Sequence, residues 1–440
     1  MADRVLILGA SARAAAASAR RAGLEPFAID LFADADTRRI CDSLRCPPDE
    51  YPHGLFARAK QAPPMPWMYT GGLENYPELV GELARERELW GNGPDILARV
   101  RDPFQLQEWA REAGFKFPLT VPAGEKLGSG RWLRKPLRSS GGTQIDFVPD
   151  NDTTSSAATS VRQQFVDGVP MSAYVANVRG SVLYGVTQQL IGERWLHARP
   201  FAYCGSLTHD ARETGSGRPP VSPGSRPGLR QAAPEGRKAR DERSHAFTQG
   251  RWLSAPPGRP DVDPGGSPGT PGADVTHCPA SQHVADMISA LEDRCPLTWI
   301  WGFDFIWCDG ELTLLEVNSR YTASIEVVEH ASRLSLMNWG RAIFLQPPPE
   351  PRTVGKAIYY APHHLTFPAS GPWDDSLAHA DDVWRRPDFA DIPHAGDAIE
   401  RGHPVLTILA DGADYGDCLD RLQSRAADLD RLFATCHPKD

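Results

Sequence analysis

The stretch "LLEVNSRY", residues 314–321, combines the pattern of a buried strand with a regular polar pattern. Its leucines and valine suit a buried sheet, whereas Glu316, Asn318 and Arg320 recur at every second position. Because alternate residues of a strand point to one face, a carboxylate, an amide and a guanidinium are expected to line one side of the sheet. Burying such a row without partners would be costly, so we expect this face to bind something polar.

A second carboxylate, Asp304, precedes Glu316 by twelve positions across the turn "CDGE". Two carboxylates and the amide oxygen of Asn318 are hard ligands of the kind that Mg²⁺ or Mn²⁺ prefers. A strict two-residue turn at 309–310 would place Asp304 opposite Leu315, on the wrong face. The carboxylates therefore meet only if the hairpin has a three-residue loop or a one-residue bulge. The competing interpretation is the solvated face of an edge hairpin.

The segment "WLRKPLRSSGGTQI" predicts a strand that ends near Lys135 and a loop that contains Ser140, Gly141 and Gly142. A lysine supplies a point charge for phosphate, and a glycine-rich turn lets backbone N–H groups approach oxygen atoms closely. The order of residues is not that of a Walker A loop. Taken alone, the segment is more typical of a surface hairpin.

The segment "QQFVDG" is a weaker signal. It places Gln163 beside Phe165 and Val166, and a strand of this kind could offer backbone N–H and C=O groups to an adenine edge. By itself it is more typical of an ordinary strand.

The composition of the 440 residues excludes several classes of protein. The formal net charge is −9 without a long basic run, which argues against nucleic acid or an anionic membrane as the main partner. No apolar run approaches a membrane span, and the start "MADRVLILGASARA" lacks the layout of a signal peptide. The eight cysteines are scattered without a Cys-x-x-Cys pair, which indicates reduced thiols and a cytoplasmic location.

The length predicts two to three domains. The runs "RVLILGAS" and "PFAIDLF", separated by an alanine-rich helix, predict a β-α-β unit of Rossmann type in a first domain at residues 1–99. Gly9, Ser11 and Arg13 only loosely echo a dinucleotide fingerprint. A packing turn is therefore favoured over binding of a nicotinamide cofactor.

Strand and helix patterns then predict a second domain at residues 100–345 and a small α+β unit at residues 350–440. Residues 211–275 interrupt the second domain with 11 Pro and 11 Gly in 65 positions. This composition cannot bury enough apolar surface to become ordered, so we expect a disordered insertion. An error in the reading frame of the gene is the main alternative.

The lysine strand, the glycine loop, the Q-x-F-V strand and the order Asp–twelve–Glu-x-Asn-x-Arg together resemble the ATP-grasp superfamily. The first domain, with "GASARA" and "YTGGLENYP", is similar to a branch of carboxylate–amine ligases. The C-terminal "GHPVLTILADG" looks like the small barrel-like part of biotin-carboxylase-like members. The resemblance implies a mixed α/β and α+β fold with a Rossmann-like domain, an ATP-grasp domain and a small C-terminal domain.

The resemblance also implies a role for each motif residue. The nucleotide ATP would be bound by Arg101, Lys135, Ser140, Gly141, Gly142, Gln163, Phe165 and Val166. The Mg²⁺ ion would be bound by Asp304, Glu316 and Asn318. Arg320 would face an acyl phosphate and, with Lys135, act in catalysis.

Three serines depart from the family pattern. Ser319 stands where proline is usual, and Ser172 lies near the usual position of a ribose-binding carboxylate. Ser324 stands where biotin carboxylases carry a glutamate base. The resemblance thus implies an ATP-dependent ligase that joins a small carboxylate to an amine, and it leaves a homodimer open. The alternatives are an ATP-dependent carboxylase and a nicotinamide-dependent oxidoreductase.

Overall fold

The structure is a computed structural model, and it describes residues 4–149, 159–178, 181–208, 215–217, 280–333, 335–337 and 352–434. Apart from Gly215–Gly217, the proposed insertion at 211–275 lies outside the described residues, so its disorder stays a prediction. Within the described part of the chain, no helix is both long and apolar enough to cross a membrane.

The N-terminal unit is built on a parallel sheet with the strand order β3-β2-β1-β4. This arrangement confirms the predicted β-α-β start. Its strands are β1 (Arg4–Leu8), β2 (Glu25–Asp30), β3 (Asp42–Arg45) and β4 (Trp67–Tyr69). Its helices are α1 (Arg13–Arg21), α2 (Thr37–Ile40), α3 (His53–Gln61), α4 (Pro77–Glu86) and α5 (Pro94–Val100), with short 3₁₀ turns η1 (Pro48–Glu50) and η2 (Leu73–Asn75).

The turn after β1 is filled by protein groups. A Cβ atom at Gly9 would lie 1.8 Å from Oγ1 of Thr70, so only glycine fits there. The backbone N–H of Ala12, at the start of α1, donates to the Asp30 carboxylate at 2.8 Å. These contacts are those of a packing turn.

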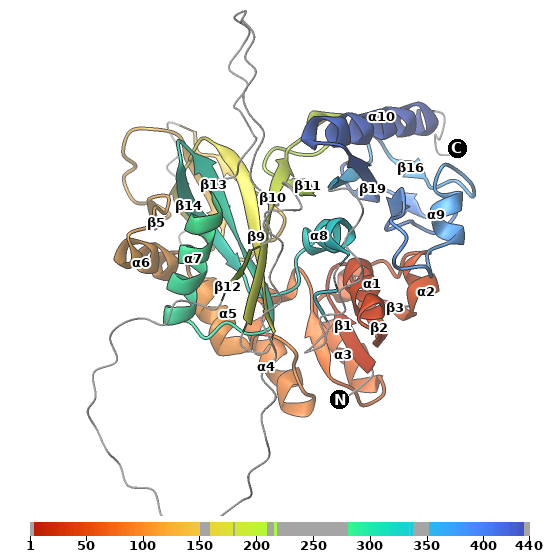
Figure 1. The fold of residues 1–440 in the computed structure, drawn as a ribbon, viewed down its shortest axis with the longest axis horizontal. Helices are drawn as coiled ribbons and strands as arrows, with labels where there is room; N and C mark the ends of the chain where they lie inside the picture. The colour runs from red at the N-terminus through yellow and green to blue at the C-terminus, as the bar shows by residue number, and fades with distance from the viewer. Residues whose placement is uncertain are drawn as a thin grey trace, which may run out of the picture.

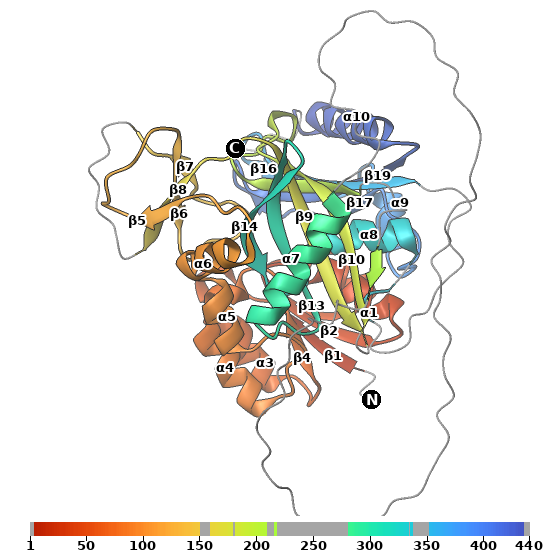
Figure 2. The same ribbon diagram turned by 60° about the vertical axis from the view of Figure 1, so that its left-hand side comes forward.

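A large antiparallel sheet follows, with the order β14-β13-β9-β10-β11-β15-β19-β17 and β12 beside β10. The strands are β9 (Val169–Val178), β10 (Ser181–Ile191), β11 (Tyr203–Thr208), β12 (Gly215–Gly217), β13 (Ile300–Cys308), β14 (Glu311–Asn318), β15 (Thr353–Tyr360), β17 (Phe389–Ala390) and β19 (Pro404–Gly412). Helix α7 (Ala280–Arg294) crosses one face of this sheet (Figure 2), and α6 (Pro103–Ala113) packs beside it. Leu291 of α7 and Trp109 of α6 enter the same core as Phe303 of β13.

A smaller antiparallel sheet, with the order β5-β8-β6-β7, stands apart from the large one (Figure 2). It consists of β5 (Thr120–Pro122), β6 (Trp132–Pro136), β7 (Asp146–Phe147) and β8 (Ser160–Gln164). This sheet carries the predicted lysine strand and, just beyond β8, the predicted Phe165 and Val166. It faces the large sheet across a cleft.

The C-terminal residues extend the large sheet, because β15 pairs with β11. Around β15 and β19 lie β16 (Leu365–Thr366), β18 (Ala398–Ile399), α9 (Asp374–Ala378) and α10 (Tyr415–Phe433). Helix α10 covers β19 at the top of the molecule (Figure 1). The domain limits at residues 99, 345 and 350 stay predictions. The large sheet continues from the second predicted domain into the third, because β11 pairs with β15.

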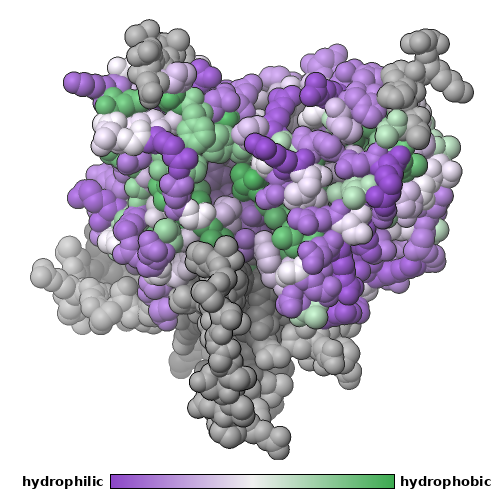
Figure 3. All heavy atoms as spheres, turned by 90° about the horizontal axis from the view of Figure 1, so that it is seen from above, coloured by the Kyte–Doolittle hydropathy of each residue, from purple (hydrophilic) through white to green (hydrophobic). Residues whose placement is uncertain are grey.

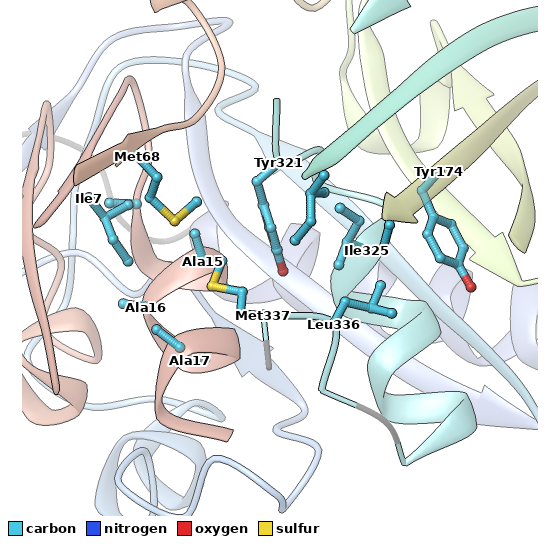
Figure 4. Close-up of a cluster of buried hydrophobic side chains, with 14 of the residues drawn as sticks. Ile7, Ala15, Ala16, Ala17, Met68, Tyr174, Tyr321, Ile325, Leu336 and Met337 are labelled. Carbon is cyan, nitrogen blue, oxygen red and sulfur yellow. The ribbon is translucent and has the colours of Figure 1, made fainter. Parts of the chain in front are cut away.

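Helix α8 (Ile325–Ser332) lies at the centre, between the large sheet and α1 (Figure 1). The small side chains of α1 let α8 and the following residues approach closely (Figure 4). This buried cluster includes Ile7, Ala15, Ala16, Ala17, Met68, Tyr174, Tyr321, Ile325, Leu336 and Met337.

A cluster of buried charges lies beside these apolar residues. Arg13 of α1 donates from both terminal nitrogens to Glu326 of α8, at 2.5 and 2.8 Å. Glu326 also accepts from Nζ of Lys356 in β15 at 2.8 Å, and Arg13 reaches Asp391 near β17 at 2.8 Å. These four residues join the N-terminal, central and C-terminal parts of the chain.

Candidate functional site

The β13–β14 hairpin places the two predicted carboxylates opposite each other. Asp309 and Gly310 form a two-residue turn with positive φ angles of 52° and 79°. The pairing then shifts by one residue beside Asp304, and this bulge brings Asp304 opposite Glu316. The structure therefore shows the one-residue bulge that the sequence required if the carboxylates were to meet.

Polar neighbours hold Asp304 in place. Oγ of Ser172 donates to Oδ1 of Asp304 at 2.6 Å, and Nε2 of Gln189 donates to the same Ser172 oxygen at 2.6 Å. On the other side, Nδ2 of Asn318 donates to Oδ2 of Asp304 at 3.2 Å. Ser172 stands near the usual position of a ribose-binding carboxylate in the family, and here its hydroxyl orients the Asp304 carboxylate.

The two carboxylates carry opposite pKa shifts. Burial, with the nearby charge of Glu316, raises the pKa of Asp304 to about 7. Burial would also raise the pKa of Glu316, but the charges of Lys135, Arg101 and Arg320 and a hydrogen bond from Asp304 lower it to about 2. Nζ of Lys135 lies 3.4 Å from Oε2 of Glu316. The charge of Glu316 thus disfavours ionisation of Asp304, and a bound cation would favour the ionised form of both groups.

These residues fit a hard divalent cation. They offer carboxylate and amide oxygens, which Mg²⁺ prefers, and the ion commonly completes its shell with water and substrate phosphates. In the described part of the chain, no group of three or more His, Cys, Asp and Glu side chains is placed to hold a metal. Two carboxylates and Asn318 are therefore the set that the hairpin provides, with room left for oxygens from a ligand.

Arg320 closes the same end of the site. Its Nη2 lies 2.8 Å from Oε1 of the buried Glu74 and 3.3 Å from Oδ1 of Asn318. Its Nη1 donates to the carbonyl oxygen of Tyr321 at 3.2 Å. The sequence did not single out Glu74, because its η2 turn lies far from the hairpin along the chain.

The glycine loop is fitted against the strand-connecting segment at 201–203. Gly141 and Gly142 have φ angles of 61° and 74°, which favour glycine. A Cβ atom at Gly142 would lie 1.8 Å from the carbonyl oxygen of Phe201, and the N–H of Tyr203 donates to the Gly141 carbonyl at 3.0 Å. Gly142 therefore needs its small size as well as its positive φ.

The opposite part of the site is aromatic. Phe165 and Phe201 each pack against Phe147, with ring centroids 5.4 and 5.2 Å away. The guanidinium of Arg131 lies 4.2 Å from the centre of the Phe165 ring. Gln163 is buried and donates to Oγ1 of Thr120 at 3.0 Å. The sequence pointed to Phe165 but missed Phe147 and Phe201, which no short motif connects to it.

One cleft of about 490 Å³ unites most of the predicted residues. Its lining includes Lys135, Gly141, Gly142, Gln163, Phe165, Val166, Asp304, Glu316, Asn318 and Arg320. Arg101 and Ser140 do not line it. Nη2 of Arg101 donates to Oδ1 of Asn75 at 2.7 Å and to the Ser139 carbonyl at 3.0 Å, so it acts on the cleft through its charge. The size suits a small organic ligand.

The face of the molecule seen from above has a distinct pattern of hydropathy (Figure 3). This face is mostly hydrophilic, with hydrophobic residues grouped around a hollow near its middle (Figure 3).

Comparison with known proteins agrees with this geometry. Residues 100–216 match the family described as "ATP-grasp domain". This part of the chain is an ATP-grasp domain. The matched residues include the glycine loop, the aromatic rings of Phe147, Phe165 and Phe201, and Ser172. The hairpin with Asp304 and Glu316 lies outside the match.

Several solved structures resemble the whole chain in fold. An L-amino acid ligase from Bacillus licheniformis has a TM-score of 0.58 at 15% identity, covering 97% of each chain. An N5-carboxyaminoimidazole synthetase from Staphylococcus aureus, complexed with ADP, has 0.57 at 10% identity, covering 96% of each. The biotin carboxylase domain of a Hydrogenobacter thermophilus 2-oxoglutarate carboxylase has 0.60 at 10% identity, covering 95% of this chain and 88% of that one. No curated protein sequence gives a significant match.

Proposed function

We propose that this ATP-grasp protein is an ATP- and Mg²⁺-dependent ligase that joins a carboxylate to an amine through an acyl phosphate. The observation that carries the proposal is the meeting of the Asp304–Glu316 pair with Lys135 and Arg320 at one end of the cleft. Two cations beside two carboxylates can hold a polyphosphate and a divalent ion together.

The residues of the cleft support separate parts of this reaction. Phe165, with the neighbouring aromatic rings, offers an apolar wall to a base. Lys135 and the backbone of the glycine loop would hold phosphate oxygens, while Arg320 would neutralise the charge that develops on the transferred phosphoryl group. Asp304, Glu316 and Asn318 would hold Mg²⁺, whose charge screens the phosphates. The protein thus aligns its substrates and excludes water, and the amine then displaces phosphate.

Ser324 favours an amine over bicarbonate as the second substrate. It lines the cleft, is 3% exposed, and its hydroxyl lies 3.0 Å from that of Thr322. A hydroxyl is a poor base at neutral pH, so this position cannot deprotonate bicarbonate as a carboxylate would. An ATP-dependent carboxylase is the second candidate, because the similar structures include biotin carboxylases. The nicotinamide alternative has less support, since protein groups fill the turn at Gly9.

Release of ADP tests the choice between ligase and carboxylase. The purified full chain is incubated with Mg-ATP and a panel of small carboxylates and amines, offered singly and in pairs. We expect ADP only when a carboxylate and an amine are present together, and none with bicarbonate plus biotin. Cleavage of ATP on bicarbonate and biotin without an amine would replace the ligase assignment by the carboxylase one.

The glycine loop gives a further prediction. We expect Gly142→Ala to weaken ADP binding at least about tenfold, because the new methyl group meets the Phe201 carbonyl at a positive φ. Isothermal titration calorimetry measures this affinity. The control is Gly128→Ala, where nothing lies within 4 Å of the added Cβ atom. Unchanged affinity in Gly142→Ala would show that the loop does not hold the nucleotide.

A further inference from the structure

A second cavity, of about 440 Å³, lies outside the cleft and is lined by three arginines. Arg194 and Arg199 come from the segment between β10 and β11, where η3 (Arg194–Leu196) packs against β15 and α10. Arg401 comes from the turn before β19. No residue lines both this arginine cavity and the cleft that holds Asp304 and Glu316.

None of the three guanidinium groups has an ion-pair or hydrogen-bond partner within the described ranges of the chain. The carboxylates nearby are engaged elsewhere. Asp430 accepts from Nε2 of His197 and from the Tyr359 hydroxyl, both at 2.7 Å. Oε2 of Glu193 accepts from Nε1 of Trp195 at 2.8 Å, and Glu400 lies 3.0 Å from Nδ1 of His364. None of these acids therefore pairs directly with a guanidinium of the arginine cavity.

The turn at Gly402 lies beside Arg199. Gly402 has a φ angle of 78°, and its N–H donates to the Ala361 carbonyl at 2.8 Å. A Cβ atom at Gly402 would lie 3.4 Å from Nη2 of Arg199, so this turn lies directly beside that guanidinium. The turn thus brings Arg401 and Arg199 to one cavity.

We propose that the arginine cavity binds a small molecule that carries a phosphate group. Guanidinium groups match phosphate through paired N–H donors, and three of them suit a dianion better than a single carboxylate. Three like charges around one cavity repel one another, and a bound dianion relieves that repulsion. The volume admits a phosphorylated metabolite rather than a bare ion alone.

The test is isothermal titration calorimetry of the full chain with inorganic phosphate in the absence of nucleotide. We expect the double variant Arg194→Gln/Arg401→Gln to bind phosphate at least about tenfold more weakly than the unaltered protein. The control, Arg39→Gln/Arg111→Gln, removes the same net charge from two other exposed positions and is expected to keep the affinity. Melting temperatures confirm that each variant is folded.

Lys135→Ala separates this site from the cleft. We expect that variant to bind phosphate as the unaltered protein does, because Lys135 does not line the arginine cavity. Three results would overturn the proposal: no binding of phosphate by the unaltered protein, equal losses in both arginine double variants, or loss of binding in Lys135→Ala. The measurement needs no turnover, so the proposed ligase activity and this site can fail independently.

Discussion

We expect Glu316→Gln to lower turnover at least about a thousandfold, on the order of 4 kcal/mol, while the fold stays intact. Glu316 faces Asp304 and Lys135, and the surrounding positive charges keep its pKa near 2, so the side chain is ionised at any working pH. Glutamine has nearly the same shape but removes the charge that would hold a divalent cation. ADP release at a range of Mg²⁺ concentrations measures both the turnover and the apparent affinity for the metal.

Glu311→Gln is the matched control, because it makes the same substitution on the same hairpin. Glu311 is exposed and pairs with Lys116 at the protein surface, away from the cleft. We expect this variant to keep its turnover and its Mg²⁺ dependence, since exposed pairs contribute about 0–1 kcal/mol. Full activity of Glu316→Gln with an unchanged Mg²⁺ requirement would remove Glu316 from the metal site.

The β13–β14 hairpin shows how much of the site can be predicted from the local sequence. Alternation fixed the face shared by Glu316 and Asn318, and the spacing to Asp304 left two possible turn geometries. The structure has positive φ angles at Asp309 and Gly310 and a bulge beside Asp304. Local propensity can predict the tight turn, but the bulge depends on how both strands pack in the large sheet, so the sequence could state it only as a condition.

Long-range contacts account for what the sequence did not predict. Phe147 and Phe201 meet Phe165 only when the two sheets face each other, and Glu74 meets Arg320 across the N-terminal unit. None of these residues belongs to a periodic pattern or a short motif. The resemblance places Arg101 at the phosphates. Its side chain donates to Asn75 beside the glycine loop, and its part in nucleotide binding stays a prediction.

The buried charges that join the three parts of the chain were also hidden from sequence reasoning. Arg13 was considered as part of a loose dinucleotide fingerprint, yet its guanidinium is 3% exposed and points to Glu326 and Asp391. A polar residue at a helix start predicts a surface role unless its distant partners are known. The partners here lie more than 300 positions away.

We expect Glu326→Gln to lower the free energy of unfolding by about 3–5 kcal/mol, the largest effect on stability among the changes considered. Lys356 is 3% exposed and its ammonium group lies 2.8 Å from Glu326, so the substitution leaves a buried charge without its counter-ion. Arg13 keeps Asp391 and is therefore less affected. Urea denaturation followed by fluorescence and circular dichroism measures the change, and the two signals show whether the parts of the chain unfold together.

Two further variants show whether charge burial is the cause. Glu25→Gln breaks an exposed pair with Arg4 and is expected to change stability by less than about 1 kcal/mol. Adding Lys356→Met to Glu326→Gln should recover part of the loss, because the unpaired ammonium is removed. If the double variant were no more stable than the single one, loss of packing rather than an unpaired charge would explain the effect.

The difference in unfolding free energy between the unaltered protein and Glu326→Gln is expected to depend on pH. Burial would raise the pKa of Glu326, but Arg13 and Lys356 hold it well below its ordinary value of 4.5. A carboxylate with a lowered pKa in the folded state contributes stability above the unfolded pKa and loses it as the pH falls through the folded value. The gap between the unaltered protein and Glu326→Gln should therefore be full at pH 7 and shrink below about pH 4.5. A gap that stayed constant down to the acid limit would mean that the charge of Glu326 does not hold the three parts of the chain together.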